Sequence, residues 1–163
     1  MEPSQLIAKY RGKGVLLDTN LMVLLAIGLY KRERISSFKR TDKYTARDFS
    51  LVTDIMNKFE RRITTPHILA ETDNLTRQLP GREHNAVAAI LAPLIENLFE
   101  IYSPSVTAVR HERYSTLGLT DCVTIAAADE ILVITDDLRL SNILSHLGRD
   151  AININHIRTL NWT

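Results

Sequence analysis

Acidic side chains stand where short apolar runs of the chain end, which is where they could do chemistry together. Asp18 ends the first such run, and Asp136 and Asp137 directly follow the run Ile131–Thr135. Asp121 begins an alanine-rich stretch with helical spacing. If the runs are strands of one parallel sheet, their carboxyl ends meet at one edge, where folds of this kind place their sites. The sequence therefore predicts a cluster of carboxylates at that edge.

Glu71 is a further acidic candidate, because it shares a helix face with apolar residues. Ile68 lies three residues before it and Leu75 lies four residues after it, so the three side chains point the same way. A carboxylate on a buried face must be paired, protonated or bound to a metal. A salt bridge to an arginine is the structural alternative. Asp73 lies about 200° further round the same helix and is expected to face solvent.

Carboxylates that converge without matching bases repel one another strongly. Two like charges about 4 Å apart cost about 4 kcal/mol at an effective dielectric constant of about 20. A divalent cation removes this cost, and a site made only of oxygen ligands suits Mg²⁺ or Mn²⁺. Such an ion lowers the pKa of a bound water and stabilises charge on a phosphoryl oxygen. Each aspartate also has a structural explanation, since aspartate is preferred at helix N-termini.

The elements that would position these residues alternate along the chain. Short apolar strands are predicted at 14–18, 62–65, 100–103, 131–135 and 151–154. Helices are predicted at 20–30, 47–60, 65–79, 83–99, 105–117, 120–130 and 138–147, with an exposed connection at 31–46. This order predicts a single α/β domain over residues 1–163, built as a three-layer α/β/α sandwich with a central, mostly parallel sheet.

The composition agrees with one globular domain. The chain has 163 residues, of which 45% are hydrophobic and 24% are charged, and these values argue against disorder, a collagen-like fibre or a coiled coil. A single cysteine, Cys122, allows no intramolecular disulfide and makes a cytoplasmic location the expectation. The longest apolar run, Leu21–Tyr30, is too short to span a membrane. We expect it to form a buried helix, so no membrane partner is predicted.

The charge of the chain is unevenly distributed, although its formal net value is only +1. A basic segment at about 31–62, expected to be helical in part, holds ten basic and five acidic residues. Residues 111–163 hold seven acidic and four basic residues. A basic flank beside an acidic region suits a protein that holds phosphates near a metal. The alternative is a helical hairpin with a charged, solvated surface.

Four segments of the sequence resemble PIN domains, and they occur in the family's order. They are VLLDTNLMVLL (15–25), TPHILAE (65–71), GLTDCVTIAAA (118–128) and VITDD (133–137). The first and third are the most specific, because an aspartate before Thr-Asn and a Leu-Thr-Asp before an alanine-rich helix form an unusual pair. The resemblance covers essentially the whole chain. It is closest to the small prokaryotic type that includes the VapC toxins.

The resemblance implies an acidic metal site. Asp18, Glu71 and Asp121 match the family's first three acidic residues. Many relatives end the site with Thr-x-Asp-x-Asp-Phe, whereas this chain reads TDDLRL from Thr135 onward, so that Asp137 matches the first aspartate and Arg139 replaces the second. Whether Asp136 or Asp137 faces the metal stays open. Asn20 and Thr135 match positions that support the carboxylates by hydrogen bonds.

The activity that the resemblance implies is metal-dependent cleavage of RNA. The chain would be an endoribonuclease that uses Mg²⁺ or Mn²⁺, the toxin of a toxin–antitoxin pair, with an antitoxin protein and a second copy of itself as partners. Lys39, Arg40 and Lys43 of the basic segment would guide the RNA backbone. Two alternatives stay open: a non-catalytic PIN-fold module that binds RNA or protein, and a housekeeping RNA-processing nuclease.

Apolar residues of the predicted helix 47–60 are candidates for the contact surface of the dimer that the resemblance implies. Leu51, Ile55 and Phe59 could form a dimer face or belong to the core. Their helical spacing favours the core.

Overall fold

A five-stranded, all-parallel sheet forms the centre of the computed structural model, which describes residues 1–159. The strands are β1 (Val15–Leu17), β2 (Arg62–Thr64), β3 (Phe99–Glu100), β4 (Leu132–Thr135) and β5 (Ala151–Asn153), in the order β3-β2-β1-β4-β5. Every residue of β1 and β4 is buried. Strands buried on both faces are apolar throughout rather than alternating, which is why these two were predictable from short apolar runs.

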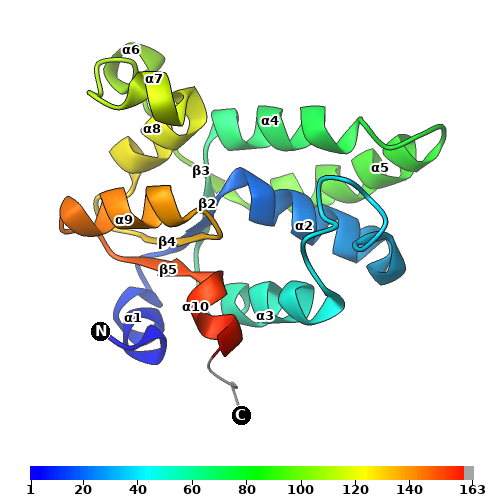
Figure 1. Cartoon of the computed structure of the whole chain (residues 1–163), viewed down its shortest axis with the longest axis horizontal. Helices are drawn as coiled ribbons and strands as arrows, with labels where there is room; N and C mark the ends of the chain where they lie inside the picture. Colours follow the sequence, from blue (N-terminus) through cyan, green and yellow to red (C-terminus); the bar gives the residue numbers. More distant parts are fainter. Residues whose placement is uncertain (160–163) are drawn as a thin grey trace.

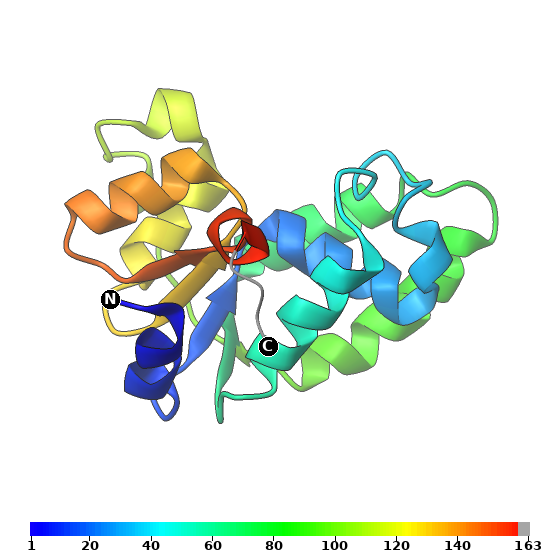
Figure 2. The ribbon, with the colours of Figure 1, turned by 60° about the horizontal axis from the view of Figure 1, so that its bottom comes forward.

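Helices cover both faces of the sheet. They are α1 (Pro3–Tyr10), α2 (Thr19–Tyr30), α3 (Ala46–Met56), α4 (Pro66–Thr76), α5 (Glu83–Glu96), α6 (Ser105–Ala108), α7 (Tyr114–Leu117), α8 (Leu119–Ala127), α9 (Leu138–His146) and α10 (Ile154–Thr159), with a 3-10 turn at Arg32–Arg34. Figure 2 shows α1 on one side of the strands and α9 on the other. The predicted α/β/α sandwich with a parallel sheet is confirmed.

The chain changes direction across the sheet between β1 and β4. From β1 it proceeds to β2 and β3 on one side, and it then returns to form β4 and β5 on the other side. The register pairs Val15 with Leu132 and Leu17 with Ile134, so the two central strands end together. Ligands of open parallel sheets bind at such a switch point, outside the carboxyl ends of the strands. Asp18 and Asp136 immediately follow these two ends.

Helix α2 forms the centre of a helical layer beside the sheet. It is apolar all round and is buried from Leu21 to Gly28, as expected for a helix with neighbours on several sides. It packs on α3, α4 and α5, which gather around it in Figure 1. Gly28 lets α3 pack closely against α2, because a Cβ at this position would lie 2.1 Å from Cδ2 of Phe49. Within residues 1–159, no helix is long and apolar enough to cross a membrane.

The predicted exposed connection at 31–46 is wrong in one respect, because apolar side chains fix it to the core. Ile35, Phe38, Thr41 and Tyr44 are all buried. The Thr41 hydroxyl donates to the carbonyl oxygen of Ile35 at 2.8 Å. This loop therefore has a defined shape, and it carries its basic side chains on a fixed backbone.

Several predicted boundaries also differ from the structure. The helix predicted at 105–117 is two short helices, because a turn in which the Arg113 N–H donates to His111 Nδ1 separates α6 from α7. Helix α5 continues through Pro93 and ends at Glu96, before the predicted end. The predicted strand at 100–103 is Phe99–Glu100.

Two helices, α1 and α10, were not predicted from the sequence. Helix α1 begins with Pro3 and a capping box, and α10 follows β5 directly.

Ile55 and Phe59 are buried in the core, whereas Leu51 is only partly buried. The core interpretation of Ile55 and Phe59 is therefore confirmed, and these two side chains do not present a free apolar face.

Candidate functional site

A cleft of about 200 Å³ lies at the carboxyl edge of the sheet, and four carboxylates line it. They come from four parts of the chain: the start of α2, the middle of α4, the first turn of α8 and the start of α9. The lining residues are Asp18, Thr19, Asn20, Glu71, Leu117, Gly118, Leu119, Thr120, Asp121 and Asp137. The structure thus brings together Asp18, Glu71, Asp121 and Asp137, four of the five acidic candidates from the sequence.

Asp18 is held rigidly where β1 ends. Its Oδ1 accepts the Leu21 N–H at 2.9 Å as the N-cap of α2, and its Oδ2 accepts the Thr135 hydroxyl and, at 3.2 Å, the Asp136 N–H. Burial raises the pKa of Asp18 to about 7, and the nearby charge of Asp136 adds to this rise, against the opposing effect of the hydrogen bonds. One carboxylate therefore fills both roles, helix cap and site residue.

Thr135 supports the site in the predicted way. Its hydroxyl is buried, donates to Asp18 and accepts the N–H of Asp137 at 2.9 Å. Asp137 in turn caps α9, because its Oδ1 accepts the N–H groups of Arg139 at 2.7 Å and Leu140 at 3.3 Å. The last residue of β4 thus links two of the cleft carboxylates.

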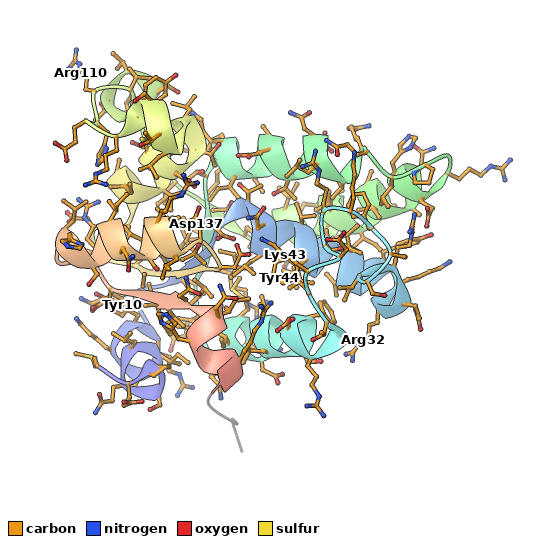
Figure 3. The ribbon with its side chains drawn as sticks, in the orientation of Figure 1. Tyr10, Arg32, Lys43, Tyr44, Arg110 and Asp137 are labelled. Carbon is orange, nitrogen blue, oxygen red and sulfur yellow. The ribbon has the colours of Figure 1, made fainter. Side chains whose placement is uncertain are left out.

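Asp137, and not Asp136, lines the cleft. The carboxylate of Asp136 accepts hydrogen bonds from Lys43, from the Tyr44 hydroxyl at 2.7 Å and from Asn20 at 3.2 Å. Burial alone would raise the pKa of Asp136, but the bonds from Lys43 and Tyr44 hold it below its ordinary value. Figure 3 shows Lys43 and Tyr44 beside one another on the loop before α3. Asn20 supports a carboxylate as predicted, although that carboxylate is Asp136.

Asp121 and Glu71 are the other two carboxylates that line the cleft. Burial raises the pKa of Asp121 to about 6, with further contributions from the charges of Asp137 and Glu71, while Arg139 lowers it. Glu71 accepts a hydrogen bond from the Thr19 hydroxyl at 3.3 Å. Within residues 1–159, no basic side chain lies within 4.0 Å of the Glu71 carboxylate. The salt-bridge alternative for Glu71 is therefore not found.

The predicted face of α4 is partly wrong. Its buried residues are Ile68, Thr72 and Thr76, whereas Leu75 is only partly buried. Glu71 borders this buried line and turns toward the start of α2. Asp73 is half exposed and pairs with Arg77 at 2.8 Å, which agrees with the expected surface position.

The three basic residues assigned to RNA do not form one free patch. Lys43 donates to Asp136, and Nε of Arg40 donates to Gln78 at 2.7 Å. Lys39 is exposed. Arg34, from the same segment, forms a two-bond pair with Glu83, at 3.0 Å for each bond. The basic segment is therefore partly committed to contacts within the protein.

Sequence reasoning missed two groups of site residues. Thr19 and Tyr44 hold carboxylates through contacts that span 52 and 92 residues of chain, and no local pattern signals them. The cleft wall at 117–120 was also missed. Gly118 could have indicated it, because its φ of 85° requires glycine where the chain turns from α7 into α8.

The donor chemistry of the cleft fits a hard divalent cation. Its ionisable lining groups are all carboxylates, and burial with like charges disfavours the ionised forms of Asp18 and Asp121. Oxygen ligands suit Mg²⁺ and Mn²⁺. As the side chains stand in residues 1–159, no group of three or more histidine, cysteine, aspartate or glutamate residues is arranged to hold a metal ion.

Comparison with known proteins adds no name to this site. No protein-family model matches the chain, and no curated protein matches it.

Proposed function

We propose that the protein is a metal-dependent endoribonuclease of the PIN type, which hydrolyses phosphodiester bonds of RNA and serves as the toxin of a toxin–antitoxin pair. The observation that carries this proposal is the meeting of Asp18, Glu71, Asp121 and Asp137 in one cleft at the switch point of a parallel sheet. Carboxylates concentrated there, in a cleft whose lining residues within 1–159 include no lysine or arginine, favour the binding of a divalent cation.

The residues that would hold Mg²⁺ or Mn²⁺ are Asp18, Asp121 and Asp137, with Glu71 binding directly or through a water. When bound, such an ion lowers the pKa of a water and stabilises charge on a phosphoryl oxygen. The protein's own contribution is to orient the ligands. Thr135 and the N-terminus of α9 hold Asp18 and Asp137 in place, so that little ordering remains to be done when substrate binds.

The carboxylate of Glu71 is held more loosely than those of Asp18 and Asp137. Its bond from Thr19 is 3.3 Å long, and Glu71 is only half buried. This carboxylate can therefore move toward a bound ion or toward a water without breaking a short hydrogen bond. We assign Glu71 the more adaptable position in the site.

Exposed basic residues of the loop at 31–45 are expected to strengthen RNA binding. Replacing both Lys39 and Arg40 with Gln should weaken binding about tenfold and lower the slope of log Kd against log salt by about 1.4, because each lost phosphate contact in single-stranded RNA contributes about 0.7. Fluorescence anisotropy with a labelled RNA between low and high salt measures both quantities. Lys58→Gln, on an exposed residue beyond α3, is the control. Unchanged affinity and slope in the double variant would contradict the assignment.

The nuclease proposal is tested with labelled single-stranded RNA and purified protein in Mn²⁺, in Mg²⁺ and in EDTA. We expect cleavage in the presence of metal and none in EDTA, because the proposed mechanism needs the ion to lower the pKa of the attacking water and to stabilise charge on the phosphoryl oxygen. Cleavage that continues in EDTA would contradict a metal mechanism. RNA binding without cleavage of any substrate, from protein that binds no Mn²⁺, would favour the non-catalytic binding module instead.

The toxin assignment needs its own test, because toxicity depends on the target and on an antitoxin partner. Expression of the wild-type chain should arrest growth, and Asp18→Asn should relieve the arrest. Normal growth with active, expressed nuclease would favour a housekeeping role in RNA processing.

A further inference from the structure

Arg139 is a basic residue that lies beside the acidic cleft. It lies in the first turn of α9, two residues after Asp137. Its Nη2 lies 3.8 Å from Oδ2 of Asp137, one of the carboxylates that line the cleft. Lys43 differs from it, since its ammonium already donates to Asp136. The guanidinium of Arg139 therefore lies at the rim of the cleft, near one of the four carboxylates.

The contacts of Arg139 with the protein do not account for its position. A separation of 3.8 Å is too long for a hydrogen bond, and its guanidinium donates no hydrogen bond to any residue in 1–159. Its side chain is 71% exposed, so the ion pair contributes little to stability. A cation in the first turn of a helix is also unfavourable, because the dipole is positive at that end.

We propose that Arg139 binds a phosphate of the RNA substrate at the rim of the cleft, beside the bond that is cut. This inference rests on the proposed ribonuclease function and names a residue that recognises its substrate. A cleft lined by carboxylates repels a polyanion, whereas a planar guanidinium offers parallel N–H donors that fit phosphate oxygens. Arg139 can turn toward a phosphate without losing a hydrogen bond to the protein, so its reorientation costs little.

The test uses three variants of the full chain: Arg139→Gln, Arg139→Lys and Arg110→Gln as the control. Arg110 is exposed, and Figure 3 shows it far from Asp137, at the outer end of the α6 region. Steady-state cleavage with Mn²⁺ should show KM raised about tenfold in Arg139→Gln, with kcat within about twofold of wild type, since one charged contact to substrate is lost. The KM of Arg139→Lys should lie between those of wild type and Arg139→Gln, because lysine keeps the positive charge but lacks the planar guanidinium with its parallel N–H donors.

Binding without cleavage gives an independent readout. In an Asp121→Asn background, anisotropy should show that Arg139→Gln weakens RNA binding about tenfold and lowers the salt slope by about 0.7. Arg110→Gln should leave affinity and slope unchanged. The melting temperatures of all three variants should lie within about 2 °C of that of wild type. The side chains of Arg139 and Arg110 are exposed, and the Arg139–Asp137 pair contributes little to stability.

The outcomes distinguish a failure of the inference about Arg139 from a failure of the proposed ribonuclease function. If the wild type cleaves RNA and Arg139→Gln keeps its KM and salt slope, the inference is overturned and the nuclease proposal stands. An equal loss in Arg110→Gln would also overturn it, because the effect would then be one of overall charge. If the wild type cleaves no RNA in Mn²⁺ or Mg²⁺, the proposed function fails, and the inference fails with it.

Discussion

Asp121→Asn should lower kcat for RNA cleavage at least about 1,000-fold, since it removes an anionic group that, on the proposed function, would bind the metal. Asparagine has nearly the same shape, so the loss is one of charge rather than of packing. Burial raises the pKa of Asp121 to about 6, and the ionised form is therefore disfavoured in the fold. The variant should consequently melt at or above the wild-type temperature at pH 8. Single-turnover cleavage and thermal melting together measure both effects.

Asp73→Asn is the matched control for this loss. Asp73 lies on α4 two residues beyond Glu71, but its carboxylate pairs with Arg77 at the surface. Its replacement should leave kcat within about twofold of wild type, because a surface ion pair contributes little. A folded Asp121→Asn protein that keeps more than about a tenth of the wild-type kcat would contradict the assignment of Asp121 as a ligand.

Metal-free protein should lose stability as the pH rises from 5 to 8. The folded-state pKa values of Asp18 and Asp121, about 7 and about 6, lie above the ordinary value of 3.8. The folded state therefore binds more protons than the unfolded state in this window, so the free energy of unfolding falls with pH. Asp18 alone should account for a loss on the order of 3 kcal/mol. Urea unfolding in EDTA at pH 5, 6, 7 and 8 measures it.

Metal should reverse this dependence. Saturating Mn²⁺ at pH 8 should restore the lost stability, since an ion that binds the folded state alone stabilises it by mass action. The double variant Asp18→Asn, Asp121→Asn should show a flat profile in EDTA, and Asp73→Asn should keep the wild-type slope. A free energy of unfolding that stays level or rises from pH 5 to 8 in EDTA would contradict the electrostatic description of the cleft.

The fold was predictable where local patterns decide it. Strands β1 and β4 are continuous apolar runs because both their faces are covered, and the parallel topology then fixed the edge at which a site could form. Helix α1 was missed, because its few core contacts, Leu6, Ile7 and Tyr10, are spread over only eight residues. A short helix gives too little periodicity to predict it from sequence.

The candidate site was predictable in its residue types but not in its partners. Adjacent aspartates 136 and 137 look alike in sequence, and their different roles depend on Lys43 and Tyr44, which approach from a loop more than 90 residues away. The same holds for Glu71, whose helix face indicated burial but not the hydroxyl of Thr19 that it meets. Long-range contacts of this kind follow from the packing of α2, α4 and the loop, which no short motif encodes.

Calorimetric titration with Mn²⁺ at pH 7.5 tests most directly the proposal that the four carboxylates of the cleft hold a divalent cation. The wild-type chain should bind Mn²⁺ saturably, and Asp121→Asn should bind at least about tenfold more weakly, while Asp73→Asn binds as the wild type does. No saturable binding by the folded wild-type chain, or equal binding by wild type and Asp121→Asn, would contradict the claim.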